Sequence, residues 1–183
     1  MEMKITIRQT WNILLVLSWI IFVGLCIEAG GFIVNAIFAI VNPAVITYLW
    51  RQIDLSGLLK YDHGYFFVVT LVLSIITIVK AWLFFLIIKI LHNKDLNMSQ
   101  PFSKKVRRFI FRLSYAALLI GLFSLYGVKY TEWLIKQGIK MPDTQYMQLG
   151  GSDVWLFMAV VLFIIAQIFN RGIEIQSENE LTI

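Results

Sequence analysis

The chain contains four long apolar runs, and most of its charged and turn-forming residues lie between them. A helix needs roughly 20 mostly apolar residues to cross about 30 Å of hydrocarbon. We therefore expect four transmembrane helices, at about residues 11–40, 66–91, 109–126 and 153–170. This pattern predicts an all-α fold, in which residues 1–183 form a single integral membrane domain built as a bundle of four helices.

Two connections of this predicted bundle are too apolar to be simple polar turns. After an Asn-Pro pair, residues 44–50 and 55–59 read as short amphipathic pieces. In the second connection, residues 130–139 have the spacing of an amphipathic helix, which Gly138 can end. We expect both connections to lie on the outer face of the membrane as amphipathic loops.

The composition supports a membrane protein. The chain is 59% hydrophobic and only 15% charged, whereas a soluble domain is about 45–50% apolar and about 25% charged. This balance argues against a soluble enzyme, because the chain lacks the polar residues to cover a soluble surface. The single cysteine, Cys26, lies inside an apolar run, which argues against a disulfide scaffold or a thiolate metal site.

The distribution of charge predicts the orientation of the chain. Most of its 16 lysines and arginines lie near the N-terminus, in or beside the linker 92–108, and in the tail 171–183. Short loops rich in Lys and Arg remain in the cytoplasm. We therefore expect a multi-pass protein of the bacterial cytoplasmic (inner) membrane, with the linker and both termini in the cytoplasm.

Two ionisable residues fall inside predicted spans. Lys80 lies nine residues before Lys89, about 13 Å deeper along the helix, where a charge costs at least about 2.5–3.5 kcal/mol on insertion scales. We expect Lys80 to meet a polar partner, either Glu28 or one of Ser18 and Ser124. The set is interpreted as a structural polar clamp between helices, or alternatively as a pathway for a solute or proton.

The linker and the tail carry opposite charges. Ser103 is expected to cap a helix whose polar side holds five cations, and this surface is predicted to bind anionic phospholipid headgroups, although a plain topology signal is the alternative. These cations are Lys104, Lys105, Arg107, Arg108 and Arg112. In the tail, the acids Glu174, Glu178 and Glu180 accompany an alternating pattern at 173–176. The tail could add a strand to a partner, fold against the linker, or be a frayed terminus.

The sequence holds no pattern typical of a catalytic centre. His63 and His92 lie on opposite predicted sides of the membrane, so they cannot share a metal ion. We expect no catalytic residue, cofactor or metal, and no direct nucleic-acid binding, because the basic run sits against the bilayer. Asp54, Asp62 and His63 lie close together in the sequence, and the alternative is a hydrolytic or cation site at the outer surface.

Three motifs connect this chain with a known family. They are Met-Ser-Gln-Pro-Phe-Ser at 98–103, where the family usually has Asn-Pro-Phe-Ser, Trp-Leu-Ile-Lys-Gln-Gly at 133–138, and the acidic ending at 172–183. With its four-span layout, the chain resembles, over nearly its whole length, the bacterial membrane family catalogued as domain of unknown function 2975. The resemblance provides no catalytic residues. It implies a partner by association, because members are often encoded beside a small helix-turn-helix regulator.

These observations favour a non-enzymatic membrane regulator or sensor that presents its inner surface to a cytoplasmic partner, such as a DNA-binding regulator. A small transporter or channel subunit using Lys80 and Glu28 is the alternative, and a lipid-modifying membrane enzyme is a third. A homo-oligomer is compatible with each of them.

Overall fold

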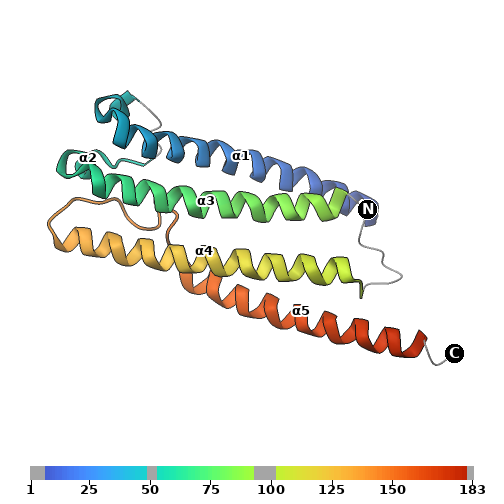
Figure 1. Cartoon of the computed structure of the whole chain (residues 1–183). Helices are drawn as coiled ribbons and strands as arrows, with labels where there is room; N and C mark the ends of the chain where they lie inside the picture. The colour runs from blue at the N-terminus through green and yellow to red at the C-terminus, as the bar shows by residue number, and fades with distance from the viewer. Residues whose placement is uncertain (1–6, 49–52, 93–101, 181–183) are drawn as a thin grey trace, which may run out of the picture.

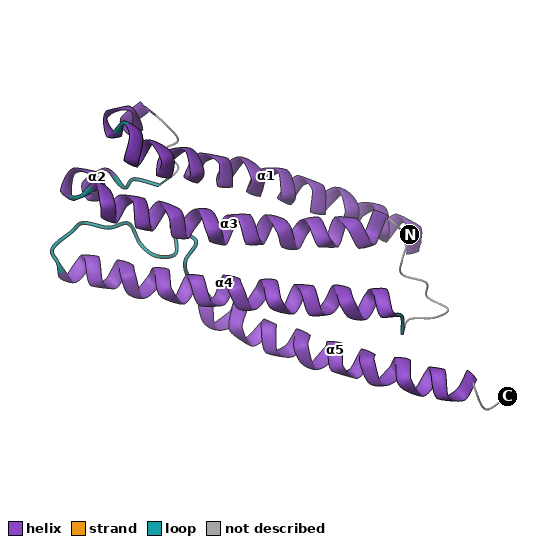
Figure 2. Cartoon of the chain, in the orientation of Figure 1, coloured by secondary structure: helices purple, strands orange, loops and turns teal. Residues whose placement is uncertain are grey.

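The computed structural model describes residues 7–48, 53–92 and 102–180. Helices and loops make up this part of the chain (Figure 2). The elements in order are α1 (Ile7–Val41), a 3-10 helix η1 (Pro43–Tyr48), α2 (Ser56–Tyr61), α3 (His63–His92), α4 (Lys104–Lys136) and α5 (Ser152–Glu180).

The four long helices lie side by side in the order α1, α3, α4 and α5 (Figure 1). The pairs α1–α3 and α4–α5 have the most extensive contacts, and α3 joins the pairs by packing on α4. One end of the bundle, called the basic end below, holds the start of α1, the end of α3, the start of α4 and the end of α5. The opposite end, called the loop end, carries η1, α2 and the end of α4.

All four predicted spans are present as helices long and apolar enough to cross a membrane, which confirms the fold class. The outermost helices contribute least to the core, because few residues are buried in the most apolar stretches of α1 and α5. Their exposed residues are mainly apolar, such as Ile20, Ile40, Phe157 and Ile168. Such surfaces suit contact with lipid chains, and the protein is an integral membrane protein.

α4 is longer than its predicted span of 109–126. The segment 130–139 was expected to be helical and to end near Gly138, which is confirmed as far as Lys136, but it is not separate from the span, because α4 continues through it. No glycine or proline follows Gly127 in this stretch, so nothing interrupts the helix before Gly138. Gly138 has a φ of 84°, and the amide of Ile139 donates to the carbonyl of Leu134 at 3.2 Å, an arrangement typical of a helix end.

Both long connections pack into the main core instead of only covering it. In the first, Leu58 of α2 is fully buried, as are Met147 and Leu149 of the second at 0% and 1% exposure. Gly127 of α4 makes room for this insertion, since a Cβ there would lie 2.8 Å from Leu149. Residues 137–151 therefore return along the bundle, and α5 begins part of the way along α4 (Figure 1).

Candidate functional site

The inserted connection joins the two ionisable residues of the spans. The side-chain amide of Gln148 donates to Oε1 of Glu28 at 2.7 Å, and Nζ of Lys80 donates to the backbone carbonyl of Gln148 at 3.4 Å. The charges of Lys80 and Glu28 also attract each other. One residue of the connection thus links α1 to α3, and we call Glu28, Gln148 and Lys80 the polar clamp.

The backbone of Gln148 is held in an unusual conformation. Its φ of 55° lies in the left-handed region, which a residue with a side chain adopts at a cost of roughly 1–2 kcal/mol. Its neighbours Met147 and Leu149 are anchored in the core, so the backbone between them cannot relax without extracting one of them. This geometry turns the side chain toward Glu28 and the carbonyl toward Lys80.

Among the described residues, neither of the two serines considered as partners of Lys80 forms a hydrogen bond with it. The hydroxyl of Ser18 donates to the carbonyl of Leu14 in its own helix at 2.7 Å. The hydroxyl of Ser124 is fully buried and has no hydrogen-bond partner in the part of the chain that the structure describes. Lys80 and Glu28 thus share Gln148 as a common hydrogen-bond partner, and the sequence did not single out this residue.

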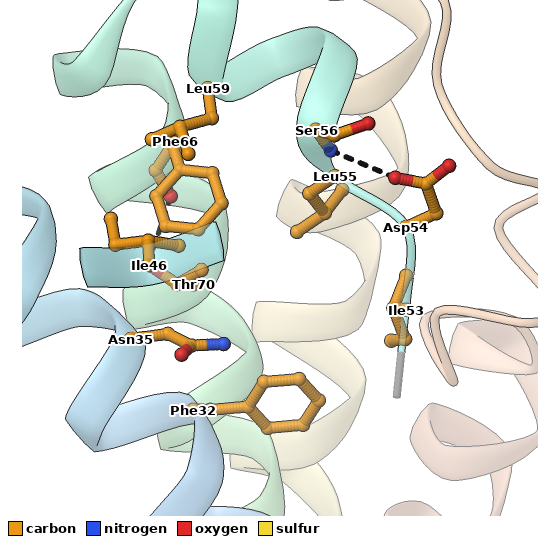
Figure 3. A pocket seen from close by; sticks show the side chains of 10 residues that line it. All are labelled: Phe32, Asn35, Ile46, Ile53, Asp54, Leu55, Ser56, Leu59, Phe66 and Thr70. Atoms are coloured by element: carbon orange, nitrogen blue, oxygen red, sulfur yellow. Dashed lines mark hydrogen bonds between the residues drawn. The ribbon is translucent and has the colours of Figure 1, made fainter. Parts of the chain in front are cut away.

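A cavity of about 410 Å³ lies at the loop end between α1, α3 and the first connection (Figure 3). Most of the residues that line the cavity are apolar, and a few are polar. Its volume falls in the range of small-molecule sites. The lining residues are Phe32, Asn35, Ile46, Ile53, Asp54, Leu55, Ser56, Leu59, Phe66 and Thr70. Thr70 directs its hydroxyl to the carbonyl of Phe66 at 2.9 Å, and Asp54 accepts from the amide of Ser56 at 3.0 Å. Nothing in the sequence indicated this cavity, because its walls come from three separate segments.

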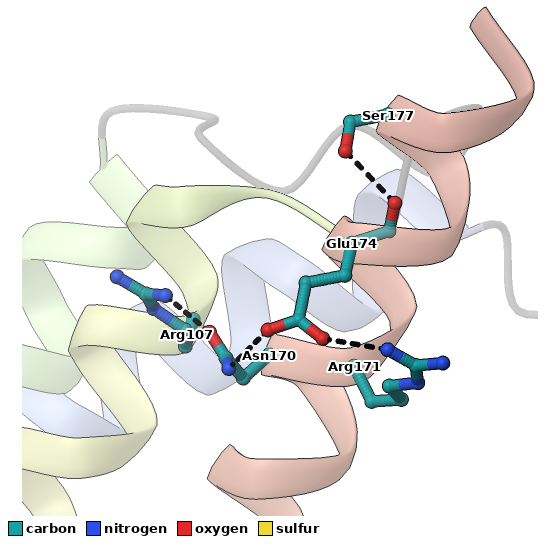
Figure 4. Close-up of polar contacts among 5 residues, drawn as sticks. All are labelled: Arg107, Asn170, Arg171, Glu174 and Ser177. Atoms are coloured by element: carbon teal, nitrogen blue, oxygen red, sulfur yellow. Dashed lines mark hydrogen bonds and ion pairs between the residues drawn. The ribbon is translucent and has the colours of Figure 1, made fainter.

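The five cations of the linker do not form one surface. Lys105, Arg108 and Arg112 line a crevice between α4 and α3, whereas the guanidinium of Arg107 donates to the side-chain oxygen of Asn170 in α5 (Figure 4). Lys104 is exposed at the start of α4. The predicted cap is confirmed, because Ser103 accepts from the amide of Val106 at 3.2 Å.

The tail is helical as far as Glu180, so the strand and frayed-terminus alternatives are both wrong for these residues. The amide of Asn170 donates to Glu174 at 2.9 Å, and Arg171 forms an ion pair with the same carboxylate at 3.0 Å (Figure 4). Gly172 lies so close to Phe102 that a Cβ would approach its ring to 2.5 Å. The start of the tail therefore packs against the linker, as one of the three alternatives predicted, although through Gly172 on Phe102 rather than through an acid. Glu178 belongs to the same helix, whereas the side chain of Glu180 and residues 181–183 lie outside the described residues.

The loop-end carboxylates Asp54 and Asp62 have local structural contacts. Asp62 accepts from the amide of Tyr65 at 2.9 Å at the start of α3, as Asp54 does from Ser56 before α2. The described residues hold no group of three or more His, Cys, Asp or Glu side chains that could bind a metal ion.

Comparison with protein-family models gave a match over residues 54–183 to the family described as "Protein of unknown function (DUF2975)". The match runs from the first connection to the end of the chain and leaves α1 outside, so it is shorter than the resemblance seen in the sequence. No curated protein and no solved structure matches the chain.

Proposed function

The chain belongs to the family of proteins of unknown function DUF2975, and we propose that it is a non-enzymatic regulator or sensor of the bacterial cytoplasmic membrane. The observation that carries the proposal is the end of α5. This helix extends beyond the start of α4 (Figure 1), and Arg171 and Glu174 keep 66% and 48% of their side chains exposed. A docked helix with an exposed charged face is a preformed surface for a partner.

The proposed orientation puts the basic end in the cytoplasm. Lys89, Lys104, Lys105, Arg107 and Arg108 all belong to this end. The excess of Lys and Arg beside the spans is the feature that retains a loop on the cytoplasmic side. In this orientation, the tail helix faces the cytoplasm and the cavity at the loop end faces the opposite side.

The proposed partner is a DNA-binding regulator with a basic surface. Glu174 and Glu178 make the end of α5 acidic, and nucleic-acid-binding proteins carry basic patches that an acidic helix can contact. The family resemblance, which associates these proteins with helix-turn-helix regulators, supports the same class of partner. On this proposal, the membrane protein holds or releases the regulator according to a signal.

The alternative of a small transporter or channel subunit depends on Lys80 and Glu28. Their geometry favours a clamp, because Gln148 lies between them and uses both its side chain and its carbonyl. A relay of protons or ions needs successive ionisable groups along its path, and here a neutral amide connects the two charged residues.

The proposal is tested by capture of a purified helix-turn-helix regulator of the class that the family resemblance implies. The full-length protein in nanodiscs serves as bait, and a variant with Glu174→Gln and Glu178→Gln is compared with a variant carrying Glu132→Gln and Asp143→Asn at the loop end. Both pairs remove two negative charges from exposed positions. We expect the tail variant to lose capture and the loop-end variant to retain it. Equal capture by all three proteins would refute the role of the tail.

A further inference from the structure

A small crevice at the basic end lies between the last turns of α3 and the first turns of α4. It has a volume of about 200 Å³ and is lined by Leu86, Lys89, Ile90, Lys105, Arg108, Phe109 and Arg112. Residues separated by three, four and seven positions share one face of a helix. Both groups of lining residues have this spacing, so one face of α3 and one face of α4 form the two walls.

Four cations line this crevice, and they come from both walls. In the described part of the chain, no carboxylate contacts Lys89, Arg108 or Arg112. The positive charges of these three residues repel one another, and an anion between them removes this repulsion. Arg107 does not take part, since it is bonded to Asn170 on the side of α5. The crevice therefore gathers only some of the cations near the linker, and an anion is the ligand that suits their charge.

The other lining residues of the two walls are apolar. Leu86 and Ile90 are buried, at 5% and 7% exposure, and Phe109 lies beside them on α4. Arg112 follows Lys105 by seven residues, which is about 10 Å along the helix axis. The cations thus extend from the end of the bundle into the span. A ligand that matches both features carries an anionic head and an apolar body.

We infer that the crevice binds the phosphate group of an anionic phospholipid, with Lys89, Arg108 and Arg112 around the phosphate and an acyl chain along Phe109 and Ile90. Basic pockets between membrane helices bind such headgroups, and the planar guanidinium of arginine can donate two parallel hydrogen bonds to a phosphate. This inference is independent of the proposed regulatory function. It divides the predicted lipid-binding cations into two groups, because Lys105, Arg108 and Arg112 line the site, whereas Lys104 and Arg107 do not.

The test measures lipid binding to the full-length protein in neutral detergent by native mass spectrometry. Phosphatidylglycerol, phosphatidylcholine and inorganic phosphate are titrated separately. A variant with Arg108→Gln and Arg112→Gln is compared with a control carrying Lys104→Gln and Lys129→Gln, which loses the same charge outside the crevice. One cation near an anionic lipid is worth about five-fold in affinity, so the crevice variant is expected to bind phosphatidylglycerol about 30-fold more weakly. The control is expected to lose less than about five-fold.

Lys89→Gln provides a second variant on the other wall, and it decides the question if the double variant does not fold. It is expected to weaken phosphatidylglycerol binding about five-fold while leaving phosphatidylcholine binding unchanged. Equal losses in the crevice and control variants would overturn the inference, because they indicate diffuse attraction. Binding of phosphatidylcholine as tightly as phosphatidylglycerol would overturn it as well. Displacement of the lipid by inorganic phosphate at equal concentration would overturn the lipid assignment and indicate a site for a soluble phosphate.

Discussion

The polar clamp gives the most direct test of how the connection 137–151 holds the spans together. Replacing Gln148 with alanine removes the donor that reaches Glu28, while the backbone carbonyl that accepts from Lys80 remains. Glu28 is only 8% exposed, so little water can replace the lost hydrogen bond. The substitution therefore leaves a buried carboxylate without its amide partner.

Two known ranges bracket the expected magnitude. Hydrogen bonds between membrane helices average about 0.6 kcal/mol and reach about 1.7 kcal/mol, whereas bonds to charged groups in proteins contribute about 1.5–3 kcal/mol. The bond from Gln148 has a charged, buried acceptor at 2.7 Å, which places it near the overlap of the ranges. We expect Gln148→Ala to lower the free energy of unfolding by about 1.5 kcal/mol.

The left-handed backbone at Gln148 separates two contributions. Glycine adopts a φ of 55° without steric strain, so Gln148→Gly relieves the backbone while it removes the same side chain. We expect Gln148→Gly to be less destabilising than Gln148→Ala by about 1 kcal/mol. Gln145→Ala, at an exposed position of the same connection, is the matched control and should change stability by less than about 0.5 kcal/mol.

The assay is reversible unfolding of the purified protein in mixed micelles, carried out as a double-mutant cycle with Glu28→Leu and Gln148→Ala. The cycle isolates the interaction between the two side chains from the other effects of each substitution. A coupling energy of about 1 kcal/mol or more is expected. A value near zero, with equal stability of the alanine and glycine variants, would refute both the clamp and the strained backbone.

Three further predictions concern other parts of the bundle. Gly121→Ala should lower the free energy of unfolding by about 1–3 kcal/mol in the same assay, because the new Cβ would lie 2.8 Å from Leu156. Gly24→Ala is the control and should be neutral or stabilising, because nothing lies within 4 Å of its new Cβ. Equal effects of the two substitutions would contradict close packing of α4 on α5. Ser103→Ala should cost about 1 kcal/mol through loss of the bond to Val106, whereas Ser103→Asp should retain it, and a loss in both variants would contradict the capping role. In a background without the native cysteine, a cysteine at Gln137 should react with an impermeant label from outside intact cells and one at Ser177 only after permeabilisation; labelling of Ser177 from outside would contradict the proposed orientation.

The lengths of the apolar runs determined the four spanning helices, because crossing the hydrocarbon core is a local requirement on about 20 consecutive residues. The cap at Ser103 was equally predictable, since a cap depends on a side chain and an amide three residues away. The cost of burying a charge also identified Lys80 and Glu28 as residues that need polar partners. Each of these features follows from a short stretch of sequence or from one energetic penalty.

The tertiary structure decided which side chains meet. Gln148 lies in a turn-forming segment, and nothing in that segment shows that it returns into the bundle to reach Glu28, which is 120 residues away. Arg107 and Arg108 are adjacent in the sequence but contact different helices, which is also a tertiary feature. Neighbouring positions on a helix point about 100° apart. The packing of α5 and α3 around α4 therefore decides that Arg107 meets α5 and that Arg108 faces α3. A hydrophobic pattern defines the faces of each helix, but contact between residues distant in sequence depends on how the helices and their connections pack.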